Sequence, residues 1–253
     1  MEDDGFQLVL RKRKKKLPNV THLSYARRFD NISLEQISSV VEKAVAKMRY
    51  SMNMVIEMIK DVPAYKQNGQ AIQIRAIGVG NFSGCEAQDY GCHQLALLLL
   101  LKEYFDCEVS FQDPVTTENE KLWLQSRNIS WLKATALDNC NACSNPGYLI
   151  LFYMPHCDVA LYNSLIYAHR SKLCLEKIVI LGNNLVSFRV NAKYKNELSV
   201  LLAYREVCKC LPLPVYDGSP FSFNDTAIHF LDKVHPEVQD KEPHYDFYKI
   251  LYH

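Results

Sequence analysis

The sequence lacks the features that place a chain in a membrane or in the secretory pathway. Its longest apolar run, residues 95–101, is followed at once by charged residues, whereas a membrane-spanning helix needs about 20 apolar residues. The N-terminus opens with Glu2, Asp3 and Asp4 and has no apolar core of the kind that a signal peptide carries. We therefore expect no membrane contact and a cytoplasmic protein.

An excess of either charge is also missing, because 29 Lys and Arg residues stand against 28 Asp and Glu residues. No global field would therefore direct the molecule to nucleic acid or to an acidic membrane. The local exception is residues 11–16, which are all Arg or Lys. This run is either a solvated arm or a segment for nuclear import or nucleic-acid contact. We expect residues 1–33 to form a basic flexible arm, with nucleic-acid binding or nuclear location depending on it alone.

No catalytic signature is present. The chain has no Gly-x-Ser-x-Gly elbow, no P-loop lysine and no Ser-His-Asp order, which disfavours hydrolase, kinase and dehydrogenase functions. Nine cysteines without a secretory signal are more plausibly reduced thiols than a disulfide framework. Cys140 and Cys143 form a single Cys-x-x-Cys pair, with His156 and Cys157 downstream, whereas a structural zinc site normally needs four ligands. We predict neither catalytic residues nor a metal site, and the sequence names no cofactor.

A long amphipathic helix is expected at residues 34–60, where apolar residues recur at helical spacing. Ser33 is placed to cap it, and Pro63 is expected to close the element. This leader helix would pack on the main domain as an N-terminal helical extension.

The chain from there to residue 235 alternates strand-like and helix-like patterns. Strands are expected at residues 72–77, 107–112, 129–132, 148–154, 177–181 and 227–231, and helices at residues 83–105, from residue 117, and at residues 159–170 and 196–208. This alternation predicts an α/β domain with a Rossmann-like, mostly parallel sheet. Residues 236–253 are expected to form a polar C-terminal tail.

Three helices of this domain have capping residues in the sequence. Ser83 and Glu86 form a Ser-x-x-Glu box, and Thr117 and Glu120 form a Thr-x-x-Glu box. Asp158 is placed to cap the helix that follows the fourth strand. Inside the first of these helices, a glycine at position 91 suggests close packing against the sheet.

The turn after the first strand is the first candidate ligand site. Residues 78–84 read Gly-Val-Gly-Asn-Phe-Ser-Gly, which matches the dinucleotide fingerprint at its first two positions and has Ser83 at the third. Gly78 would make the tight turn, Gly80 would let a ligand approach, and Ser83 with the free amides would offer donors to an anion. Asp113 ends the second strand, where such folds hold an acid for ribose hydroxyls. Alternatively, the glycines serve only the turn and Asp113 is a surface residue.

Further polar groups follow the fourth and fifth strands. Because ligands of open α/β sheets bind outside the carboxyl ends of the strands, these groups are expected on the same edge as the turn. His156 is either a general base or ligand contact, or it only hydrogen-bonds a neighbouring loop. The candidate ligand-binding residues are Gly78, Gly80, Ser83, Asp113, His156 and Asn183.

Several short segments together resemble one family. Residues 77–83, the Gln-Leu-Ala-Leu-Leu-Leu-Leu helix, and Phe-Gln-Asp-Pro at residues 111–114 contribute. Met-Pro-His-Cys at residues 154–157, followed by Ala-Leu-Tyr-Asn at residues 160–163, is the most specific part. The chain thus resembles the "sensitivity to red light reduced" (SRR1-like) family over residues 35–232.

This resemblance implies a eukaryotic regulatory protein with protein partners that the sequence does not identify. It implies a role in a circadian clock input pathway and, as in animal members, in the regulation of heme biosynthesis and clock-gene expression. It implies no settled catalytic activity. Cys210 is separated from Pro212 by Leu211, so direct heme binding through a Cys-Pro pair is not indicated.

Two functions are compatible with these sequence features. The first is a regulatory protein that uses the strand-end residues for a ligand or partner. The second is a transferase that uses S-adenosylmethionine or another nucleotide cofactor, since Gly78, Gly80, Asp113 and His156 follow suitable strands. A nucleotide-like small molecule is the expected ligand in either case.

Overall fold

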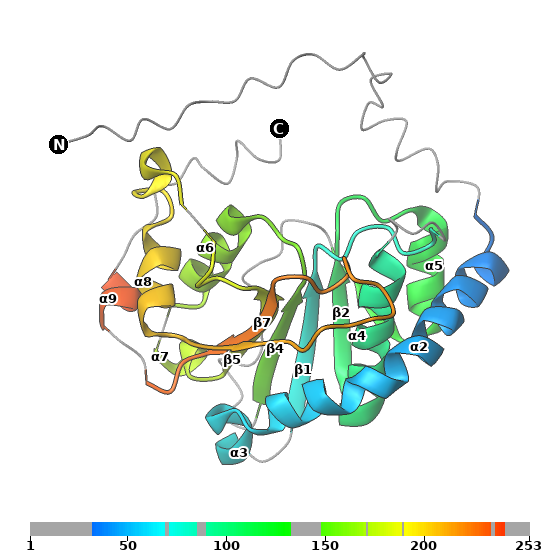
Figure 1. The fold of residues 1–253 in the computed structure, drawn as a ribbon, viewed down its shortest axis with the longest axis horizontal. Helices are drawn as coiled ribbons and strands as arrows, with labels where there is room; N and C mark the ends of the chain where they lie inside the picture. The colour runs from blue at the N-terminus through cyan, green and yellow to red at the C-terminus, as the bar shows by residue number, and fades with distance from the viewer. Residues whose placement is uncertain are drawn as a thin grey trace.

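A seven-stranded sheet runs through the computed structural model in the order β3-β2-β1-β4-β5-β7-β6 (Figure 1). The structure describes residues 32–68, 71–84, 90–132, 148–170, 172–188, 190–233 and 236–240. Strands β1 to β5 are parallel to their neighbours among themselves, whereas β7 is antiparallel to both β5 and β6. The strands are β1 (Ala71–Ile77), β2 (Glu108–Gln112), β3 (Ile129–Trp131), β4 (Tyr148–Met154), β5 (Ile178–Asn183), β6 (Lys209–Pro212) and β7 (Thr226–Phe230).

The predicted α/β class and mostly parallel sheet are confirmed. The chain builds β1, β2 and β3 outward in one direction, and then returns to place β4 and β5 on the other side of β1. This strand order is the one expected of a doubly wound sheet, and it puts the topological switch point between β1 and β4. A ligand site is therefore expected at the carboxyl ends of these two strands.

Helices cover both faces of the sheet (Figure 1). They are α2 (Leu34–Lys60), α3 (Pro63–Asn68), α4 (Gly91–Phe105), α5 (Glu118–Ser126), α6 (Val159–Ala168), α7 (Lys172–Leu175), α8 (Ser199–Val207) and α9 (Pro236–Asp240), with a 3₁₀ turn at Ala192–Tyr194. Apolar side chains of α2, α4 and α5 form one core on one face, and those of α6, α7 and α8 form a second core on the other. The sheet is thus buried on both sides, as a mostly parallel sheet requires.

The leader helix is confirmed as α2, with the predicted bounds. The Ser33 hydroxyl accepts the amide of Gln36, and the Gln36 side chain accepts the amide of Ser33, which makes a complete capping box. The expectation that Pro63 closes the element was only partly right. Pro63 begins the short helix α3, because proline is well tolerated in the first turn of a helix.

The predicted start of α4 was wrong. The helix begins at Gly91, so Ser83 does not cap it, while Glu86 lies outside the described residues. A Cβ atom on Gly91 would stand 2.2 Å from the carbonyl oxygen of Asn81. The glycine therefore lets the helix start press against the turn after β1, and not against the sheet as expected.

The C-terminal strands also differ from the prediction. β5 continues through Asn183, and β6 was missed because Pro212 and Pro214 indicated a break. Proline is tolerated at a sheet edge, and β6 is one of the two edge strands, with Pro212 as its last residue. β7 was expected as a sixth strand, and its insertion between β5 and β6 in the opposite direction had no local signal.

Within the described ranges, no helix combines the length and apolarity needed to cross a membrane. Residues 1–31 and 241–253 lie outside these ranges, so the basic N-terminal arm and most of the polar tail stay predictions. The short helix α9 occupies the beginning of the segment expected as a tail.

Candidate functional site

A cavity of about 640 Å³ opens at the carboxyl ends of β1, β2 and β4. Four of the six predicted site residues line it, namely Gly78, Gly80, Asp113 and His156. These residues are far apart in the sequence, and the parallel strands bring them to one edge of the sheet. The predicted convergence on the switch point therefore holds for these four residues.

The glycine turn has the backbone conformation that glycine alone adopts easily. Gly78 and Gly80 have φ angles of 68° and 79°, where a side chain would strain the backbone. A Cβ atom on Gly78 would also stand 2.5 Å from the Cys157 sulfur, whereas one on Gly80 would meet nothing within 4 Å. Gly78 is thus required by packing, and Gly80 faces open space in the cavity.

Asp113 fixes the turn to the segment after β2. The carboxylate is 4% exposed; Oδ2 accepts the amide of Gly80 at 2.8 Å, and Oδ1 accepts the amide of Val115 at 2.8 Å. Burial raises the pKa of the Asp113 carboxyl, and the two amides oppose this change. A carboxylate can accept about four hydrogen bonds, so both oxygens keep capacity for a ligand hydroxyl.

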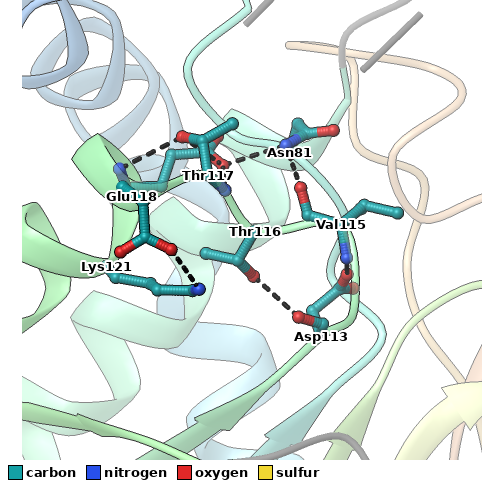
Figure 2. Close-up of polar contacts among 8 residues, drawn as sticks. Asn81, Asp113, Val115, Thr116, Thr117, Glu118 and Lys121 are labelled. Carbon is teal, nitrogen blue, oxygen red and sulfur yellow. Dashed lines mark hydrogen bonds and ion pairs between the residues drawn. The ribbon is translucent and has the colours of Figure 1, made fainter. Parts of the chain in front are cut away.

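Glu120 holds the far side of the same turn. Its Oε1 atom accepts the amides of Phe82 at 2.7 Å and Ser83 at 3.0 Å, and Oε2 accepts the side-chain amide of Asn81 at 2.9 Å. Figure 2 shows Asn81 reaching from the turn to Val115, whose carbonyl oxygen accepts it at 2.7 Å. Glu120 is fully buried, so two carboxylates clamp the turn from opposite ends.

The hydrogen bonds to the two carboxylates leave fewer backbone amides of the turn free to bind an anion. The amide of Gly78 donates to the carbonyl of Gln112, and those of Gly80, Phe82 and Ser83 donate to the two carboxylates. Four amides of the turn therefore already have protein acceptors. A phosphate would have to compete with carboxylates for them.

His156 follows β4 and has a φ angle of 60°, an uncommon value for a residue with a side chain. Its amide donates to Oδ1 of Asn183 at 2.7 Å. The Gln94 side-chain nitrogen donates to the Ser222 carbonyl at 2.9 Å and lies 3.2 Å from Nδ1 of His156. From these partners we assign Nδ1 as the acceptor and Nε2 as the protonated nitrogen of a neutral ring.

The surroundings of the His156 ring favour that neutral form. The protein packed around the ring lowers its pKa, although the hydrogen bonds that the ring donates to the backbone and side chain of Asn224 oppose the change. The rings of Tyr90 and His156 meet in an edge-to-face arrangement, with their centroids 5.6 Å apart. His156 therefore hydrogen-bonds its neighbours and also lines the cavity, and its role as a general base or ligand contact stays a prediction.

Asn183 and Ser83 do not line the cavity. Asn183 lies behind it, where its side chain accepts the amide of His156 and donates to the carbonyl of Cys157 at 2.8 Å. Ser83 is 2% exposed, and its hydroxyl has no hydrogen-bond partner within the described part of the chain. Asn183 thus positions the β4 turn, and Ser83 is a buried residue of the glycine turn that does not line the cavity.

Four other residues of the cavity wall were not predicted as site residues. Gln94 was visible only as the polar residue before the apolar run of α4. Tyr90 precedes that helix, and Phe221 and Asn224 come from the loop between β6 and β7. A long irregular loop has no periodicity, so its contribution to the wall could not be predicted.

No group of three or more His, Cys, Asp or Glu side chains that could hold a metal ion occurs in the segments that the structure describes. Cys157 is buried, and its sulfur donates to the carbonyl of Ile77. Burial raises the pKa of this thiol far above its usual value, which makes it unreactive. Cys140 and Cys143 lie outside the described residues.

Comparison with known proteins supports the family resemblance. A family model described as the SRR1 domain matches residues 55–230. The Arabidopsis thaliana protein named "SENSITIVITY TO RED LIGHT REDUCED 1" is 25% identical over 167 residues, which are 63% of this chain and 58% of that protein. A Mus musculus SRR1-like protein is 31% identical over 112 residues, 42% of each chain.

Both alignments leave more than a third of the relatives' own length unmatched. The family model, however, matches well over half of this chain and includes β1 to β7 and the cavity between them. The chain therefore belongs to the SRR1 family.

Proposed function

We propose that this chain is a regulatory protein in light or clock signalling, and that its SRR1 domain responds to a small molecule bound in the strand-end cavity. The observation that carries the ligand part is the convergence of Gly78, Gly80, Asp113 and His156 on one cavity. The regulatory part rests on the family and on the name of the plant relative. The finer roles in a clock input pathway, clock-gene expression and heme biosynthesis belong to the same proposal and rest on the family resemblance.

The cavity wall favours binding over chemistry. Cys157 is the thiol in this wall, and its buried sulfur is occupied by a backbone carbonyl. Asp113 is tied to two backbone amides, and the His156 ring is held between Gln94 and Asn224. Groups held so firmly suit the recognition of a ligand.

A transferase that uses S-adenosylmethionine or another nucleotide cofactor is the second candidate. It is supported by His156, a neutral imidazole that lines the same cavity as Asp113. A neutral imidazole can act as a general base. Conversion of S-adenosylmethionine to S-adenosylhomocysteine by the purified protein with cell extract, lost in a His156→Gln variant, would favour this candidate.

Thermal stability of the purified protein tests the ligand part. We expect one member of a panel of nucleotides, NAD, S-adenosylmethionine and hemin to raise the melting temperature, since a ligand at one hundred times its Kd adds about 2.7 kcal/mol. Gly80→Arg should abolish the shift by filling the cavity. Gly80→Ala is the matched control, because it introduces the same backbone strain and its Cβ atom meets nothing within 4 Å.

Failure of the whole panel to stabilise the native protein would remove the ligand part. The regulatory part has its own readout, a circadian luminescence reporter in cells depleted of the endogenous protein. The native chain should restore the rhythm, and the Gly80→Arg chain should not. Equal rescue by both chains would separate the regulatory role from the cavity.

A further inference from the structure

The charges around the cavity restrict the kind of ligand that it can take. Among the described residues that line it, Asp113 and Asp158 are acidic, none is Lys or Arg, and the pKa of His156 is lowered. Sites for nucleoside di- and triphosphates are built from cations and free amides that offset two to four negative charges. This cavity offers the opposite charge.

The glycine turn adds to this restriction. Four of its amides are already bound by Gln112, Asp113 and Glu120, so these four donors are not free for a phosphate. At the start of α4, by contrast, Tyr90 provides no side-chain cap. The positive end of the helix dipole there can accommodate the single carboxylate of a zwitterion.

Aromatic and apolar side chains form the rim of the same cavity. Tyr90 is 41% exposed, Val115 51% and Phe221 62%, and all three line the opening. Large apolar side chains that stay exposed around a cavity indicate a ligand surface. The rings of Tyr90 and Phe221 can stack on a nucleobase, and aromatic faces also attract cations.

Asp113 supplies the remaining element of recognition. It directly follows β2 in a sheet of doubly wound order, where an acidic residue hydrogen-bonds ribose hydroxyls. Each of its oxygens accepts one backbone amide, which leaves a lone pair on each for a hydroxyl group. A ribose next to a stacked base would fit between Asp113 and the rim.

From these features we propose that the cavity takes a phosphate-free nucleoside derivative of neutral or positive charge, the class to which S-adenosylmethionine belongs, and rejects nucleotides with phosphate chains. This inference rests on the proposed ligand function of the same cavity. It specifies the ligand class and applies whether the protein only binds the molecule or also transfers a group from it.

Isothermal titration calorimetry on the purified full chain tests this proposal, because it measures the Kd of each probe. The phosphate-free probes are S-adenosylmethionine, S-adenosylhomocysteine and adenosine, and the phosphate-bearing probes are ATP, ADP and NAD. We expect at least one phosphate-free probe to bind with a Kd ten times or more below that of every phosphate-bearing probe. Phe221→Ala should weaken this binding, whereas Val215→Ala, which changes an 86% exposed residue outside the cavity wall, should not.

A pair of variants that each add one positive charge makes the test sharper. Val115→Arg places a cation on the rim and should weaken S-adenosylmethionine while strengthening ATP, with the ratio of their Kd values shifting by tenfold or more. Val186→Arg is the matched control, because Val186 is 45% exposed, lies in a hydrogen-bonded turn and does not line the cavity. It should leave the ratio unchanged.

The alternative outcomes separate the two proposals. If ATP, ADP or NAD binds the native chain more tightly than the phosphate-free probes, and Phe221→Ala abolishes that binding, the ligand class is wrong and the ligand function stands. If a member of the wider panel, such as hemin, stabilises the protein and none of the six probes binds, the class is again wrong. Absence of any binding removes both proposals.

Discussion

Asn183 and His229 meet behind the cavity, at the end of β5 and in the middle of β7. The Nε2 atom of His229 lies 2.9 Å from the carbonyl oxygen of Asn183, whose side chain holds the backbone of His156. Cys208 stands on the other side of the ring, with its sulfur 4.0 Å from Nδ1. A buried neutral imidazole therefore supports the residue that positions the cavity wall.

His229 should make the protein sensitive to acid. Burial lowers its pKa from 6.5 to about 4. As pH falls through 6.5 the unfolded chain takes up a proton that the folded chain refuses, so stability is lost between pH 6.5 and 4, by about 3 kcal/mol at the end of this window. Urea unfolding of the native chain at several pH values should show this decline.

His229→Gln is the variant that assigns this loss, because it keeps a donor for the Asn183 carbonyl and cannot titrate. We expect a shallower decline in this variant. A smaller decline should remain, because the pKa values of His93 and His156 are also lowered. An identical pH profile in the variant and the native chain would show that His229 does not carry the effect.

At the scale of elements, Glu120 joins helix α5 to the glycine turn. Its carboxylate caps its own helix through Thr117 and also accepts the amides of Phe82 and Ser83. The sequence predicted the first role, since a capping box needs only residues three positions apart. The second role joins residues 37 and 38 positions apart, and no local pattern reports such a contact.

Glu120→Gln should lower the free energy of unfolding by about 3 kcal/mol, because the new amide group would face N–H donors inside the protein. Urea denaturation at pH 7 measures this change. Glu118→Gln is the control in the same helix, since the Glu118 side chain is 84% exposed and its change should stay within about 0.5 kcal/mol. Similar stabilities of the two variants would mean that Glu120 does not clamp the turn.

The elements that the sequence predicted well are those whose signal is local. The apolar spacing and the Ser33 cap defined α2, and the continuous apolar run of residues 148–154 defined the buried strand β4. The start of α4 was misplaced because Ser83 has the residue type of a cap, while its amide is taken by Glu120. Long-range hydrogen bonds thus overrode a valid local pattern.

For the whole molecule, the pattern of strands and helices predicted the sheet and the edge on which polar groups gather. The cavity itself needs walls from α4 and from the loop between β6 and β7, which pack against the edge only in the folded chain. Consequently, Gly78, Gly80, Asp113 and His156 were predicted, and Phe221 and Asn224 were not. The position of Asn183 behind the wall also depends on β5 extending to that residue.

Our central claim is that the strand-end cavity is the ligand site of this protein. A second hollow, lined by Arg49, Tyr50 and Lys102 among others, lies between α2 and α4 and serves as an internal comparison.

Hydrogen–deuterium exchange tests the claim most directly, because it reports where along the backbone a ligand acts. It is measured with and without a saturating concentration of the compound that raises the melting temperature most, for which we expect S-adenosylmethionine. We predict slower exchange in peptides that cover residues 78–84, 113–116 and 154–158, with no change in peptides from α2. Unchanged exchange at the strand ends, or protection confined to α2 and α4, would contradict the claim.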